Sequence, residues 1–144
     1  MGILKRVLCI IYVICVMGIV TACGNLSVED KKEKLSEYMQ AVYAPKTMGQ
    51  FYSAKEDSLS WFNDSVTNRL FVAYTDELSE LDKLRSCETI ITHGKADNQS
   101  DGKERFLVRA FLYESPKSDA VIKYFTFILN NDGNVEDFSI EDEI

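Results

Sequence analysis

The chain is poor in the residues that most often carry enzyme chemistry. It contains a single histidine, His93, and no motif surrounds it. Nucleophilic catalysis needs a nucleophile, a base and a third group that orients the base. The sequence also lacks a phosphate-binding glycine loop, a nucleophile elbow and a paired glycosidase signature. We therefore expect a protein that is not an enzyme and that uses no cofactor.

Metal ligands are equally scarce. Zinc sites use several Cys or His ligands, whereas Cys87 and His93 would lie roughly 20 Å apart in a regular strand. The segment Asn130-Asn131-Asp132-Gly133-Asn134 resembles an oxygen-rich calcium loop with Glu141 at the twelfth position, but Val135 stands where that loop requires glycine. An Asp-Gly pair is typical of a hairpin turn. We therefore favour a β-hairpin here and expect no metal site.

Basic residues are outnumbered by acidic ones. The chain has 16 Lys and Arg against 23 Asp and Glu, which gives a formal net charge of −7. Nucleic-acid binding needs clustered Lys and Arg to neutralise phosphates. Binding flat on an anionic membrane needs a basic surface as well. The charge excludes both classes of partner for the folded domain.

A long apolar run is confined to the start of the chain. Lys5 and Arg6 precede an almost uninterrupted apolar segment over 7–20, and small residues follow it. This is the pattern of a secretory signal peptide. The apolar run has about 14 residues, whereas a membrane-spanning helix needs roughly 20. A transmembrane anchor and plain secretion with a chance cysteine remain the alternatives.

The end of this segment, Val20-Thr21-Ala22-Cys23, resembles the lipobox of bacterial lipoproteins. The resemblance implies cleavage between Ala22 and Cys23 and a diacylglyceryl group on the Cys23 sulfur. Residues 1–22 would be the signal peptide, 23–27 the lipidated N-terminus with a short tether, and 28–144 one domain. We expect an extracytoplasmic protein that is anchored to the cell membrane by this lipid.

Removal of the signal peptide changes the charge and the cysteine count. Loss of Lys5 and Arg6 takes the net charge from −7 to −9. Cys9 and Cys15 leave with the signal, and Cys23 would be acylated, so that Cys87 has no partner. We expect a domain that depends on packing rather than on a disulfide, with Cys87 as a small buried side chain or a reactive thiol.

The first half of the domain has helical periodicity. Apolar residues predict a helix from about Val28 to Tyr43, capped by Ser27. We expect a connection or a short helical turn over Thr47–Asp57, then a helix that begins near Ser58 or Ser60. A short further helix follows over Asp76–Leu84. The expected apolar face of the long second helix comprises Leu59, Phe62, Val66, Leu70 and Ala73.

The second half reads as four strands joined by polar turns. The strands are expected at Cys87–Lys95, Arg105–Tyr113, Ala120–Leu129 and Val135–Ile140. This pattern predicts an α+β domain in which two or three N-terminal helices pack on one face of a four-stranded antiparallel meander sheet. The order of elements resembles the nuclear-transport-factor-two-like and cystatin-like group, whose curved sheet wraps around a helix and often leaves a cavity.

These features favour a protein-binding module at the cell envelope. It would resemble small lipoproteins that serve as secretion or conjugation accessories, or as immunity or exclusion proteins. Its partner would be an envelope or extracellular protein, docked on the outer sheet face at Leu107, Phe111 and Tyr113. The alternative is a carrier or sensor of a small apolar ligand, with a helix–sheet cavity lined by Trp61, Tyr74 and Phe125.

Overall fold

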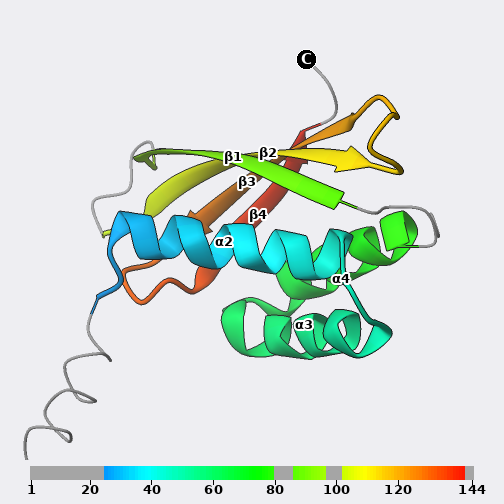
Figure 1. Ribbon diagram of the computed structural model, residues 1–144. Coiled ribbons are helices and arrows are strands. Elements are labelled where there is room, and N and C mark those ends of the chain that lie inside the picture. Colours follow the sequence, from blue (N-terminus) through cyan, green and yellow to red (C-terminus); the bar gives the residue numbers. More distant parts are fainter. Residues whose placement is uncertain (1–24, 80–85, 97–101, 142–144) are drawn as a thin grey trace, which may run out of the picture.

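The helices and strands occupy separate halves of the chain. The computed structural model describes residues 25–79, 86–96 and 102–141. Its elements are α2 (Val28–Tyr43), α3 (Met48–Trp61), α4 (Ser65–Ser79), β1 (Ser86–Lys95), β2 (Glu104–Tyr113), β3 (Val121–Leu129) and β4 (Val135–Glu141). The strands form one antiparallel sheet in the order β1-β2-β3-β4, with the helices on one face (Figure 1). The predicted α+β class is confirmed.

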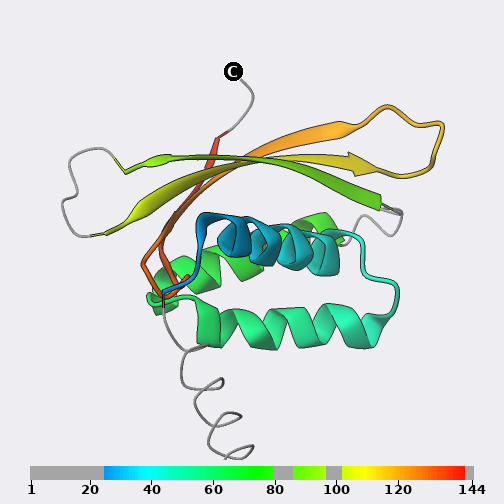
Figure 2. The same cartoon turned by 60° about the vertical axis from the view of Figure 1, so that its left-hand side comes forward.

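The three helices differ in their distance from the sheet. α2 and α4 lie directly against the strands, whereas α3 packs on the side of these helices that faces away from the sheet (Figure 2). None of the described helices lies on the opposite face of the sheet. No helix in the described ranges is long and apolar enough to cross a membrane. The predicted signal peptide and Cys23 lie outside the described residues.

The start of α2 has the predicted cap. The Asp30 amide donates to the Ser27 hydroxyl at 3.1 Å, and the Ser27 amide donates to the Asp30 carboxylate at 3.3 Å. This reciprocal pair is a capping box, which satisfies amides that have no partner inside the helix. The predicted bounds of this helix agree with the structure.

A connection or a short helical turn is predicted over 47–57, but the full-length helix α3 begins there, and the predicted helix start at Ser58 or Ser60 is wrong because both residues lie inside α3. The Thr47 side chain caps α3 by accepting from the Gln50 amide at 3.1 Å. α3 ends at Trp61, and residues 62–64 connect it to α4. There the Asp64 carboxylate accepts from the Val66 and Thr67 amides at 2.6 and 3.2 Å, which is the geometry of a helix N-cap. α4 then continues through the site at which a new helix was expected, and residues 80–84 of that prediction lie outside the described part.

The break at 62–64 also overturns most of the predicted apolar face. Leu59, Val66 and Leu70 are 70%, 53% and 61% exposed, and Ala73 is exposed as well. Phe62 is buried as expected. The three- and four-residue spacing that joined these positions runs across two separate helices, so it does not define one helical face.

The core is built largely from aromatic rings between the helices and the sheet. Phe71 of α4 is fully buried, and its ring lies 5.3 Å from Phe62, 5.8 Å from Phe127 and 4.9 Å from Phe138. Tyr38 of α2 joins the same cluster at 5.5 Å. Such edge-to-face and tilted contacts add to the stabilisation that comes from apolar burial. Phe71 therefore connects both sheet-packed helices to the strands.

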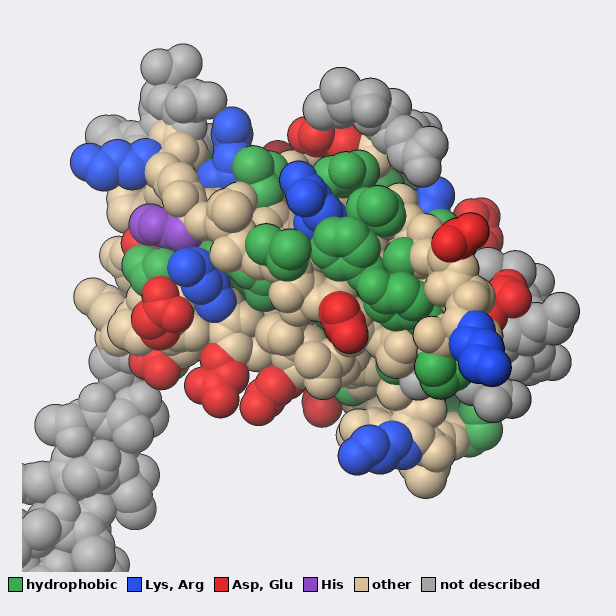
Figure 3. Space-filling model, turned by 45° about the horizontal axis from the view of Figure 1, so that its top comes forward, with side chains coloured by type: hydrophobic (Ala, Val, Ile, Leu, Met, Phe, Trp, Pro, Cys, Tyr) green, Lys and Arg blue, Asp and Glu red, His purple; other side chains and the backbone are tan. Residues whose placement is uncertain are grey.

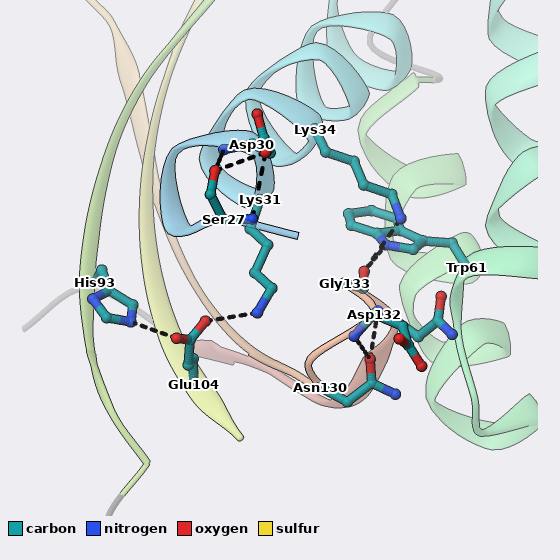
Figure 4. Close-up of polar contacts among 11 residues, drawn as sticks. Ser27, Asp30, Lys31, Lys34, Trp61, His93, Glu104, Asn130, Asp132 and Gly133 are labelled. Atoms are coloured by element: carbon teal, nitrogen blue, oxygen red, sulfur yellow. Dashed lines mark hydrogen bonds and ion pairs between the residues drawn. The ribbon is translucent and has the colours of Figure 1, made fainter. Parts of the chain in front are cut away.

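The β3–β4 turn holds the beginning of the domain. The Leu26 amide donates to the Asn131 carbonyl at 3.1 Å. Gly133 adopts a φ of +81°, and a Cβ at this position would lie 2.6 Å from the Leu26 side chain. The Gly133 carbonyl accepts from Trp61 Nε1 and, at 3.2 Å, from Lys34 Nζ (Figure 4). The chain that precedes α2 is thus fixed against this turn.

The favoured hairpin interpretation of this turn agrees with its hydrogen bonds. The Asn130 side-chain oxygen accepts from the Asp132 and Asn134 amides at 3.0 Å each (Figure 4). These bonds are the Asx type of turn, in which an Asn side chain replaces a backbone acceptor. The turn joins β3 to β4 directly, in an antiparallel pair.

A buried lysine joins α2 to the sheet. Lys31 is 2% exposed, and its Nζ lies 2.8 Å from the Glu104 carboxylate at the start of β2. The same carboxylate group lies 3.5 Å from His93 Nε2 (Figure 4). A buried charge without a partner is costly, so this pairing fixes the position of α2 along β2. His93 thus contacts Glu104, a structural role that the sequence alone does not indicate.

Candidate functional site

Side chains on the helix-free face of the sheet form the candidate site. Along β2, Phe106, Val108, Ala110 and Leu112 are buried against the helices, and the residues between them point outward, as their alternation predicts. The register places outward residues of neighbouring strands side by side. We call this surface the outer face, and its central members are Ile90, Leu107, Arg109, Phe111 and Tyr124.

Cross-strand pairing brings apolar side chains together on the outer face. Ile90 pairs with Arg109, which pairs with Tyr124 on its other side. The Arg109 guanidinium lies 5.5 Å from the centre of the Tyr124 ring, a cation–π contact. Ile90 and Leu107 are 53% and 45% exposed. Figure 3 shows that hydrophobic side chains gather over this face, with charged groups among and around them.

The centre of the outer face is hollowed. A depression of about 270 Å³ is lined by Ile90, Leu107, Arg109 and Tyr124, with Thr126 and Glu141 toward β4. Apolar walls with a few polar groups are typical of the buried centre of a protein interface. Arg and Tyr are also the residue types that most often carry binding energy there.

The three residues predicted for a partner surface lie on this face. Leu107 is exposed, whereas Phe111 and Tyr113 are half-buried. Phe111 pairs with Ile122 of β3 and with Glu88 of β1. Sequence reasoning missed the contributions of Ile90 and Tyr124. Alternation along β1 and β3, combined with the strand order, is the signal that would have found them.

The three residues predicted for a cavity belong to the aromatic core. Trp61 and Phe125 lie on either side of the buried Phe127, with ring centres 6.4 and 6.2 Å from it. Tyr74 packs against Phe125 at 5.8 Å. Tyr74 and Phe125 therefore contact each other directly, whereas Trp61 packs against Phe127. Tyr74 also lines a hollow between α4 and β4. Trp61 instead lines a groove of about 470 Å³ between α2 and α3, together with Lys34.

Cys87 is a buried thiol on the inner face of β1. It is 6% exposed and has no disulfide partner within the described ranges. Burial raises the pKa of the thiol to about 12, and the nearby Glu88 carboxylate adds to this shift. Because the thiolate is the reactive form, the thiol is inert near neutral pH.

The buried thiol predicts a loss of stability in alkali. In the unfolded chain Cys87 titrates near 9.0, so above this pH the unfolded state loses its proton first. The buried neutral thiol contributes fully to the free energy of unfolding below pH 9. Above pH 9 this contribution falls by about 1 kcal/mol per pH unit until the thiol of the folded protein also titrates. Between pH 7 and about pH 10, urea unfolding should show a larger decrease in the free energy of unfolding for the wild type than for Cys87→Ala. Equal losses would contradict this assignment.

No group of three or more His, Cys, Asp or Glu in the described part of the chain is placed to hold a metal ion. No protein-family model, curated protein or solved structure matches the chain. The outer face is therefore assigned from its geometry and chemistry alone.

Proposed function

We propose that this protein is a lipid-anchored, extracytoplasmic binding module without enzymatic activity. It engages another protein at the cell envelope, as a secretion or conjugation accessory or as an immunity or exclusion protein. The observation that supports the proposal is the outer face, which presents Ile90 and Leu107 to solvent beside the half-buried Tyr124, on a side of the sheet that none of the described helices covers. Apolar patches of this kind on a small domain mark interaction surfaces.

The position of the tether supports this proposal. The chain before α2 is held at the β3–β4 turn through Leu26 and Asn131, at one end of the sheet. A lipid on Cys23 would therefore bring this end of the domain toward the membrane and leave the outer face accessible. The acidic character of the chain would also keep the domain from lying on anionic lipid.

The carrier alternative has less support, because Trp61 and Phe125, which were proposed to line its cavity, are buried and pack against Phe127 in the core. The likeness to the nuclear-transport-factor-two-like and cystatin-like group also stays a proposal. The helix-covered antiparallel meander is compatible with it.

A charge placed on the outer face should weaken partner binding. We expect Phe111→Asp to reduce the protein recovered with the module from crosslinked membranes about tenfold, because a carboxylate would be desolvated at the contact. The matched control is Tyr52→Asp, since Tyr52 is 57% exposed on α3. It should leave recovery unchanged.

The melting transition distinguishes binding from folding in this experiment. Phe111→Asp should melt within a few degrees of the wild type. A collapsed transition would show that the half-buried Phe111 is a core residue. Leu107→Asp then tests binding without a loss of folding, because Leu107 is 45% exposed and can accept a charge without unfolding the sheet. Normal recovery with this variant would contradict the proposal.

A further inference from the structure

A second apolar surface lies along the free edge of the sheet, beside β4. A hollow of about 410 Å³ separates β4 from α4, and its walls are mainly apolar. Leu70, Ala73 and Tyr74 line it from the helix, and Phe138 and Ile140 line it from the strand. Leu70 is 61% exposed there, although it belongs to a helix that packs on the sheet. The hollow thus runs parallel to a strand edge.

The backbone of β4 is available along this hollow. β4 is the last strand of the sheet, and among the described strands β3 alone pairs with it. Its first residue, Val135, already forms a parallel bridge with Phe62 on the open side. Further along, the Phe138 amide donates to the carboxylate of the adjacent Asp137 at 2.8 Å. The start of this edge therefore already pairs with extended chain, and beyond Val135 no other described strand lies beside it.

The charges beside the edge are acidic. Asp137 and Glu141 lie on the outer side of β4, four residues apart, and both are exposed. Glu77 lines the hollow from α4. Glu136 is already engaged by Lys103 at 3.9 Å. A strand beside β4 would face apolar groups on its inner side and carboxylates on its outer side.

We propose that the edge of β4 binds an extended segment of a partner protein in which apolar and basic residues alternate. The segment would add a fifth strand to the sheet through backbone hydrogen bonds, which is a common mode of peptide recognition. Its apolar side chains would enter the hollow against Phe138 and Ile140. Its basic side chains would pair across the strands with Asp137 and Glu141. This surface adjoins the outer face, with which it shares Glu141, and it extends the set of partners beyond the one proposed above.

A second copy of this chain is the competing occupant, and the charges argue against it. Two β4 strands placed edge to edge would bring Asp137 and Glu141 of both copies together. Like charges directly opposite each other on neighbouring strands are destabilising. Charged residues on edge strands are a common means of preventing such self-association.

The test uses a labelled peptide, Thr-Lys-Val-Thr-Val-Lys-Thr, whose two lysines match the spacing of Asp137 and Glu141. Fluorescence anisotropy with the full chain should show binding about tenfold tighter than for the same peptide with Glu in place of Lys. Replacement of the central Thr by Pro keeps the charge but blocks strand pairing, so this peptide should also bind about tenfold more weakly.

Two protein variants distinguish apolar contact in the hollow from general electrostatic attraction as the source of peptide binding. Leu70→Ser should weaken binding of the Lys peptide several-fold, because apolar contact in the hollow is lost. Leu59→Ser is the matched control, since Leu59 is 70% exposed and does not line the hollow. It should bind as the wild type does.

The proposal is overturned if the Pro peptide binds as well as the Lys peptide, because the attraction would then be electrostatic only. It is also overturned if Leu70→Ser binds normally. A chain that dimerises in sedimentation and becomes monomeric on Leu70→Ser would show that a second copy occupies the edge. None of these outcomes affects the outer face, whose test uses Leu107 and Phe111.

Discussion

A Cys23→Ser variant should incorporate no labelled palmitate, whereas the wild type should be labelled and found in the membrane fraction. The lipobox resemblance places the lipid on this sulfur, and a serine oxygen would not accept the diacylglyceryl group. Each buried methylene contributes about 0.8 kcal/mol to membrane attachment, and two acyl chains hold stably where one does not. Metabolic labelling followed by electrophoresis measures this directly, and loss of the label should be complete.

The matched control for this experiment is Cys87→Ala. Cys87 is buried in the sheet, so its removal should leave labelling unchanged. Without lipidation the signal segment should also stay uncut, and Cys23→Ser should migrate as a precursor that is longer by residues 1–22. A Cys23→Ser protein that is still labelled, or still shortened, would contradict the lipoprotein assignment. An unlabelled wild type would do the same.

The largest effect on stability is expected from Phe71→Ala. Phe71 is fully buried and contacts rings from the helices and the strands, so truncation leaves a cavity where these layers meet. Replacement of a buried Phe by Ala costs about 3–5 kcal/mol. A domain of ordinary stability has only about 5–15 kcal/mol in total. Urea unfolding should show a large decrease in the midpoint, and the variant should be close to unfolded at elevated temperature.

The neighbouring residue provides the control for Phe71. Leu70 lies in the same helix but is 61% exposed, so Leu70→Ala should change the free energy of unfolding by less than about 0.5 kcal/mol. The sequence alone predicts Leu70 as part of a buried apolar helix face, whereas the structure exposes it. Equal losses in the two variants would show that α4 is rotated relative to the described arrangement.

The sheet could be predicted from the sequence, because its signals are local. Each strand is a run of β-branched and aromatic residues between polar turns, and the predicted bounds lie within a residue of those observed. The bounds of α2 were equally accessible, since Ser27 begins the helix and Pro45 follows its end. Consecutive strands then usually pair, which gives the meander.

The middle helices could not be predicted in the same way. Thr47 and Asp64 are both good caps, but the chain has many other Ser, Thr and Asp residues that could begin a helix. Only the contacts of Phe62 with Val135, and of Asn63 with the Val135 carbonyl at 2.9 Å, fix where α3 ends. These contacts join residues more than seventy positions apart, so no local pattern contains them.

The candidate site was partly accessible from the sequence. Alternation along β2 placed Leu107, Phe111 and Tyr113 on one face, and the structure puts them on the outer face. The contribution of Ile90 and Tyr124 depends on which residues of β1 and β3 lie beside Arg109. The strand register sets this arrangement, and it becomes visible only in three dimensions.

Site-specific photo-crosslinking in intact cells tests the central claim most directly. A photoreactive phenylalanine analogue placed at Phe111 of the full-length protein should yield a discrete adduct with another protein in the membrane fraction. The same analogue at Leu107 should give the same adduct, and at Tyr52 on α3 it should give none. An outer face that yields no adduct, or an adduct equally strong at Tyr52, would contradict the account of this protein as a tethered module that binds through its sheet.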